Sequence, residues 1–205
     1  MHLAEGILSV PVLAGSGALA VAGTWFGLQT LSDEDIPRAA MLTTVFFVAS
    51  LVHLPLGVTS AHLVLNGLMG LLLGWAAVPA IVIGLTLQAI LFRHGGLTVL
   101  GVNTLIMAVP AIGVYAVFRP LLRRVSHRSA LYGVGFAAGF MAILGGALLA
   151  ALALALTGRA FQGLAVLFLV THLPLGLVEG LLTGSLLLLL QRGRPGLFPG
   201  MASCE

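Results

Sequence analysis

The chain consists mainly of long apolar stretches, separated by short breaks that carry glycine, proline or charged residues. Because such breaks tend to stop helices, they divide the chain into seven candidate segments. These run over residues 11–31, 38–53, 61–73, 75–92, 103–122, 130–157 and 160–191. A helix needs about 20 apolar residues to cross a bilayer. The pattern therefore predicts an all-α membrane protein with about seven transmembrane helices.

Two of these segments depart from the ordinary length. Segment 61–73 is short, about 20 Å at a rise of 1.5 Å per residue, and is expected to cross only part of the bilayer inside the bundle. Segment 160–191 is long, and Pro174 is expected to kink it. Six transmembrane helices and one re-entrant piece would produce a similar pattern, so this alternative stays open.

The composition agrees with a membrane protein and excludes a soluble or a disordered chain. Only 7% of the 205 residues are charged, against about 25% in an ordinary soluble domain. The mean hydropathy is +1.16, whereas disordered chains combine low hydropathy with high net charge. All nine basic residues are arginines, at segment ends rather than in a stripe with aromatic residues. Nucleic acid is therefore not expected as a partner.

The arginines also predict an orientation, because cytoplasmic loops carry an excess of basic residues. With the N-terminus outside, only Arg93 and Arg159 fall on the outer side. The arginines on the cytoplasmic side are then Arg38, Arg119, Arg123, Arg124, Arg128, Arg192 and Arg194. We expect a single integral membrane domain over residues 1–191, surrounded by lipid, and a short cytoplasmic tail over residues 192–205.

The first two residues form a candidate metal-binding segment, together with the rest of residues 1–6. No cationic region precedes the apolar sequence, so a cleavable signal peptide is not expected. The amine of Met1, the backbone nitrogen of His2 and its Nδ1 can then close two chelate rings in one plane. One further imidazole would complete a square of four nitrogens, which suits Ni(II) or Cu(II) and also accommodates Co(II). The alternative is a histidine without function in an exposed tail.

Further polar residues fall on the same predicted outer side. His62 ends a segment of small residues, which permit close approach of a partner. His94 precedes two glycines, and Asn103 follows at the start of the next helix. Asn103 can cap that helix or hold a neighbouring loop with its amide. Simple turn chemistry is the alternative explanation of this loop.

Ionisable residues inside apolar segments indicate function by default, because burying them is costly. Glu179 needs a partner, for which we consider His172, two turns earlier, and the N-terminal amine. A purely structural ion pair or hydrogen bond is the alternative. His53 and His172 each precede Leu-Pro and are expected to hydrogen-bond to carbonyls freed by the proline.

Four sequence blocks together resemble the CbiM/NikM family, the substrate-binding membrane subunits of energy-coupling-factor transporters for cobalt or nickel. The blocks are MHLAEG at the start, the Gly-x-x-Ser-x-His loop that ends at His62, FRHGGLTVLGVNTLIM and THLPLGLVEG. The resemblance covers residues 1 to about 190. Arg93 stands where the family pattern favours a small or apolar residue.

The resemblance implies a fold of seven helices and a site for one metal ion. It implies that the amine of Met1, the backbone nitrogen and imidazole of His2, and His62 bind the ion in a near-square plane. His94 and Asn103 would belong to a loop that covers or braces the N-terminal segment. The supporting acids would be Glu5 and Glu179, at positions that are usually acidic in the family, without a bond to the metal.

The resemblance also implies partners and a location. The ion, Co²⁺ or Ni²⁺, would be the transported substrate, and no permanently bound cofactor is expected. Energy would come from a CbiQ-like transmembrane coupling subunit and CbiO-like cytoplasmic ATPase subunits, with a small accessory membrane subunit in some systems. The location would be the prokaryotic cytoplasmic (inner) membrane, and the imported cobalt would serve cobalamin biosynthesis.

Two other classes of protein compete with this interpretation. The first is a standalone secondary metal-ion carrier or channel, which would work without an ATPase. The second is an intramembrane metallohydrolase, but neither His-Glu-x-x-His nor a Gly-x-Ser-x-Gly nucleophile motif occurs in the chain. A phosphate-binding Gly-x-x-x-x-Gly-Lys-Ser/Thr motif is also absent from the sequence. We therefore expect a transport subunit without its own ATPase rather than an enzyme.

Overall fold

Helices occupy most of the apolar stretches in a computed structural model, which describes residues 2–56 and 59–193. The helices are α1 (Val10–Gln29), α2 (Ile36–Ala49), α3 (Asn66–Leu73), α4 (Ala77–Phe92), α5 (Leu100–Leu122), α6 (Arg128–Thr157) and α7 (Gln162–Gly193). Short 3-10 turns occur at η1 (Asp33–Asp35), η2 (Gly74–Ala76) and η3 (Arg159–Phe161). Prolines stand in the first turn of α1 and α2, where a missing N–H leaves no helical bond unmade.

Five helical stretches of the described chain are long and apolar enough to cross a membrane. They are Val10–Gln29, Asn66–Phe92, Leu100–Leu122, Arg128–Thr157 and Arg159–Gly193. Large apolar side chains such as Val21, Ile90 and Leu148 point out of the bundle, which fits a surface in contact with lipid rather than water. These findings confirm a multi-pass membrane protein.

The all-α prediction is confirmed in general, but the boundaries of two predicted helices are wrong and a short hairpin lies between them. The segment expected over residues 38–53 ends at Ala49 in α2, and the segment expected over 61–73 becomes helical only at Asn66. Between them, β1 (His53–Leu56) and β2 (Thr59–His62) form an antiparallel hairpin with His53 opposite His62. A short apolar run does not distinguish a strand from a helix by periodicity, and a proline is tolerated in an edge strand.

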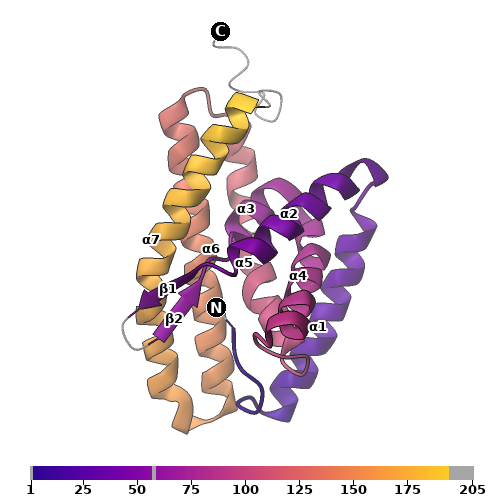
Figure 1. The fold of residues 1–205 in the computed structure, drawn as a ribbon, viewed down its shortest axis with the longest axis vertical. Coiled ribbons are helices and arrows are strands. Elements are labelled where there is room, and N and C mark those ends of the chain that lie inside the picture. Colours follow the sequence, from indigo (N-terminus) through magenta and orange to yellow (C-terminus); the bar gives the residue numbers. More distant parts are fainter. Residues whose placement is uncertain (1, 57–58, 194–205) are drawn as a thin grey trace.

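Helices α6 and α7 lie side by side and form one flank of the bundle, while α1 and α4 lie on the other (Figure 1). Helix α7 continues without interruption through Pro174. Helices α6 and α7 approach closely at Gly139 of α6, where an added Cβ would lie 2.6 Å from the carbonyl oxygen of Glu179 in α7. This close contact fixes the height of Glu179 along the bundle.

The residues before α1 enter the bundle instead of extending from it (Figure 1). Leu3 and Leu8 are buried and belong to the main hydrophobic core, together with Phe46 and Ile106. The segment that carries His2 is therefore packed against the helices rather than exposed as a tail.

Candidate metal centre

The imidazoles of His2 and His62 face each other across a short distance, and His62 is buried. The distance between Nδ1 of His2 and Nε2 of His62 is 2.7 Å, and the ring centroids are 4.5 Å apart. His2 comes from the segment before α1, and His62 is the last residue of β2. The fold thus brings together two of the side chains singled out from the sequence, 60 positions apart.

A backbone carbonyl sets the tautomer of His62. Its Nδ1 lies 2.8 Å from the carbonyl oxygen of Leu63, which can only accept, so Nδ1 carries the proton in this bond. In the neutral ring Nε2 then presents its lone pair toward His2. A histidine oriented by a carbonyl in this way is typical of metal ligands.

Asn103 holds the backbone beside His2. Leu3 donates its N–H to Oδ1 of Asn103 at 2.9 Å, and Nδ2 of Asn103 donates to the Leu3 carbonyl at 3.1 Å. Of the two roles considered for Asn103, the structure thus shows the bridge to a neighbouring segment. The residue lies inside α5 and does not cap it, because the N-cap position is Val99.

Glu5 ties the same segment to the loop between α4 and α5. The backbone N–H and the hydroxyl of Thr98 donate to Oε1 of Glu5 at 3.0 and 2.9 Å. These bonds, the backbone one first, hold the pKa of the Glu5 carboxyl below its usual value. Thr98 was not singled out in the sequence, although it stands in the HGGLT block and can donate to a carboxylate.

The two glycines after His94 leave room for the N-terminal segment. Gly95 has φ +78°, and a Cβ there would lie 2.9 Å from Nδ2 of Asn103 and 3.3 Å from Cδ2 of His2. Gly96 has φ +132°, and a Cβ there would overlap Glu5. Turn chemistry alone does not explain this loop, because both glycines are also required by what packs against them.

His94 also lies near His2. Its ring centroid is 6.3 Å from that of His2 and 6.1 Å from that of Phe92. In the described part of the chain, no three histidine, cysteine or acidic side chains group into a metal site.

The structure shows hydrogen-bond partners for Glu179 that were not named among its candidate partners. Its fully buried carboxylate accepts the N–H groups of Val64 and Leu65. His172 instead donates from Nδ1 to the Phe168 carbonyl at 2.7 Å and stacks on the Phe168 ring. Of the two candidate partners, His172 is therefore not the one that Glu179 contacts, and the structural hydrogen bond that was left open as the alternative is what the structure shows.

Other expectations for these polar residues are corrected or fall outside the structure. His172 does bond to a carbonyl, as expected, but to that of Phe168 rather than that of Val170, which Pro174 leaves free. Met1, whose amine was the other candidate partner of Glu179, lies outside the described residues. So do the side chain of His53 and the tail from residue 194 on.

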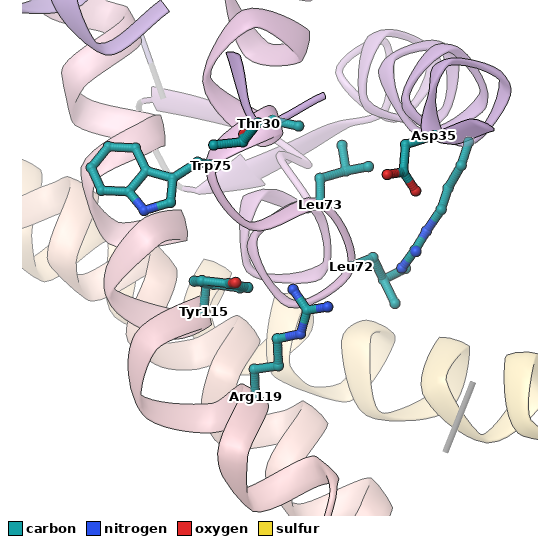
Figure 2. Close-up of a pocket in the computed structure, with 9 residues that line it drawn as sticks. Thr30, Asp35, Leu72, Leu73, Trp75, Tyr115 and Arg119 are labelled. Atoms are coloured by element: carbon teal, nitrogen blue, oxygen red, sulfur yellow. The ribbon is translucent and has the colours of Figure 1, made fainter. Parts of the chain in front are cut away.

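A separate polar pocket of about 220 Å³ lies between α5 and the loop that precedes α2 (Figure 2). It is lined by Thr30, Asp35, Arg38, Leu72, Leu73, Trp75, Ala76, Tyr115 and Arg119. The Arg119 guanidinium lies 4.8 Å from the Tyr115 ring centroid, an arrangement that stabilises the cationic side chain. Two arginines oppose binding of a metal cation here, so the histidine pair is the better candidate.

Taken together, the apolar helices and the facing imidazoles define a multi-pass membrane protein with a candidate transition-metal site in its interior. Residues 2–197 match the family model described as "Cobalt uptake substrate-specific transmembrane region" (CbiM). The chain belongs to this family.

Several proteins of known name are similar to the chain along nearly its whole length. A putative metal transport protein of Haemophilus influenzae is 40% identical, with 95% of each chain covered. The cobalt transport protein CbiM of Sorangium cellulosum is 34% identical, with 95% of this chain and 93% of the relative covered. The putative fused nickel transport protein NikMN of Archaeoglobus fulgidus is 31% identical over 95% of this chain and 67% of its own length.

A solved structure shares the fold. It is described as the crystal structure of a transition metal transporter, and it superposes with a TM-score of 0.75 at 27% identity. The match covers 94% of this chain and 93% of the other. The similarity in fold therefore extends over nearly the whole of both chains.

Proposed function

We propose that this chain is the substrate-capture subunit of an ATP-driven energy-coupling-factor importer for Co²⁺ or Ni²⁺. Membership of a cobalt-uptake family and similarity to named cobalt and nickel transport proteins support this substrate class. The ion is bound by the amine of Met1, the backbone nitrogen and Nδ1 of His2, and Nε2 of His62.

The distance between the two imidazole nitrogens carries this proposal. In a square plane with metal–nitrogen bonds of about 2.0 Å, adjacent nitrogens are about 2.8 Å apart. Amine, backbone nitrogen and Nδ1 occupy three successive corners, so the fourth donor is adjacent to Nδ1. The 2.7 Å between His2 and His62 matches an adjacent pair of this kind.

The contacts around His2 support its role as a ligand. Asn103 fixes the Leu3 backbone, Glu5 is tied to Thr98, and His94 lies beside the His2 ring. We assign these three residues to the support of the site and none of them to the metal. Because all donors must be unprotonated to bind, protonation as the segment moves offers a route for release.

We place the helices α1 to α7 in the cytoplasmic membrane. The shorter helices α2 and α3 complete the bundle inside the bilayer. The N-terminus is outside and the C-terminus is in the cytoplasm. A CbiQ-like coupling subunit and CbiO-like ATPase subunits supply the energy. Neighbouring genes for these subunits would favour the proposal over a standalone carrier, which would import metal without them.

Titration of the purified chain with Ni²⁺ and Co²⁺ tests the binding site. His62→Ala removes one of four donors, and we expect Kd to rise on the order of 100-fold, equivalent to about 2.7 kcal/mol. His127→Ala is the matched control, because His127 is an exposed histidine directly before α6. Equal affinity of wild type and His62→Ala would reject the ligand set.

A further inference from the structure

The carboxylate of Glu179 reaches from α7 to the beginning of α3, directly behind His62. It accepts the N–H of Val64 and two bonds from the N–H of Leu65, at 2.9 Å to Oε2 and 3.1 Å to Oε1. The side chain has no exposed surface. A buried carboxylate is costly unless it is fully hydrogen-bonded, so these bonds account for its place in the core.

The backbone that Glu179 holds has an unusual conformation. Leu65 is the N-cap residue of α3 and has φ +55°, which is uncommon for a residue other than glycine. No side chain of its own segment caps α3. Across the bundle, the carboxylate accepts the N–H of this N-cap residue and of Val64 before it, and so lies near the positive end of the helix dipole. Glu179 therefore stabilises the turn that follows His62.

The two imidazoles of the candidate centre are held from different helices. Asn103 of α5 fixes the backbone beside His2, whereas Glu179 of α7 fixes the backbone beside His62. The Leu63 carbonyl, which orients the His62 ring, lies next to the N–H of Val64 that Glu179 accepts. Loss of the carboxylate would free both the turn and this carbonyl.

We propose that Glu179 is a positioning residue for metal capture, which holds residues 62–65 so that Nε2 of His62 meets the ion held by His2. This inference rests on the proposed function. Glu179 makes no bond to the metal and acts only through the backbone at Val64 and Leu65. Metal affinity and metal geometry should both depend on this carboxylate.

Glu179→Gln in the full-length purified chain tests the inference. The amide keeps one acceptor but turns an NH₂ group toward the N–H of Leu65, so the turn loses a partner. We expect Kd for Ni²⁺ to rise 10- to 100-fold, as is usual for residues that orient a ligand. The visible absorption of the Ni²⁺ complex should shift toward that of His62→Ala, a change that a general loss of stability would not produce.

Thr183→Val is the matched control. Thr183 lies one turn further along α7, is equally buried and makes no hydrogen bond through its side chain in the described structure. The Thr183→Val variant should bind Ni²⁺ with the same affinity as the wild type and give the same absorption spectrum. If it weakens binding as much as Glu179→Gln does, the effect comes from core packing and the inference is wrong.

The remaining outcomes also decide the question. If the wild type binds Ni²⁺ and Glu179→Gln binds it with the same Kd and spectrum, the positioning role is rejected while the proposed function stands. If the wild type binds neither Ni²⁺ nor Co²⁺, both are rejected. Should Glu179→Gln fail to fold, Glu179→Asp withdraws the carboxylate by one methylene, and an unchanged Kd there rejects the inference.

Discussion

At the scale of single residues, the candidate centre depends on a few buried polar groups that each have a specific partner. Asn103 forms hydrogen bonds with both the N–H and the carbonyl of Leu3, and the Leu63 carbonyl orients the His62 ring. A buried donor or acceptor that loses its partner costs about 1–3 kcal/mol. Such side chains are therefore sensitive points for binding and for folding alike.

Asn103→Asp tests the bridge to Leu3. The new carboxylate still accepts the N–H of Leu3, but its second oxygen faces the Leu3 carbonyl and repels it. We expect a lower Tm and a Kd for Ni²⁺ raised about tenfold, the equivalent of about 1.4 kcal/mol. Thr104→Val, at the next position of α5 and equally buried, should leave the Kd unchanged. Wild-type binding by Asn103→Asp would contradict this role.

The sequence singled out most of the polar residues that the structure brings together around His2, but few of their hydrogen-bond partners. His2, His62, Asn103 and Glu5 could be found because polar groups are rare in so apolar a chain. The partner of Glu179 could not, because Val64 and Leu65 lie more than 110 positions away and contribute backbone groups. A backbone donor has no sequence signature, so only the fold reveals it.

At the scale of elements, the hairpin and the loop between α4 and α5 position the centre. The hairpin carries His62, and the loop covers His2 with two glycines at positive φ. The long apolar stretches and the breaks between them predicted the long helices well, because a spanning helix needs about 20 apolar residues. They did not predict β1 and β2, because a strand of four residues is too short to show a clear period.

Gly96→Ala tests the packing of this loop. The added Cβ would require positive φ and overlap the Glu5 side chain, so Glu5 must leave Thr98. We expect weaker Ni²⁺ binding and faster proteolysis of the N-terminal segment. Gly133→Ala in α6 is the control, since a Cβ there meets nothing within 4 Å and alanine favours a helix. If Gly96→Ala and Gly133→Ala bind Ni²⁺ equally well and are cleaved at the same rate, the close packing of Gly96 against Glu5 has no influence on metal binding.

At the scale of the whole molecule, the proposed orientation follows from the distribution of the arginines. The single cysteine, Cys204, lies in the tail that is proposed to be cytoplasmic. A membrane-impermeant thiol reagent should label it only after the cells are made permeable. In a Cys204→Ser background, Arg159→Cys, at an exposed position before α7, should react in intact cells. Labelling of Cys204 in intact cells, and of Arg159→Cys only in permeable cells, would indicate the opposite orientation.

The family and the general fold were within reach of the sequence, whereas the geometry of the centre was not. The four sequence blocks indicated the CbiM/NikM family, and the family match over residues 2–197 confirms it. The sequence could not establish how closely His2 and His62 approach, because that distance depends on anchors in α5 and α7.

X-ray absorption of the Ni²⁺-loaded chain tests the central claim most directly, because it reports the geometry and the ligands of the ion. We predict a four-coordinate square-planar site of nitrogen donors, with scattering from two imidazoles in the wild type and from one in His62→Ala. A six-coordinate site rich in oxygen, or a spectrum unaffected by His62→Ala, would contradict the account.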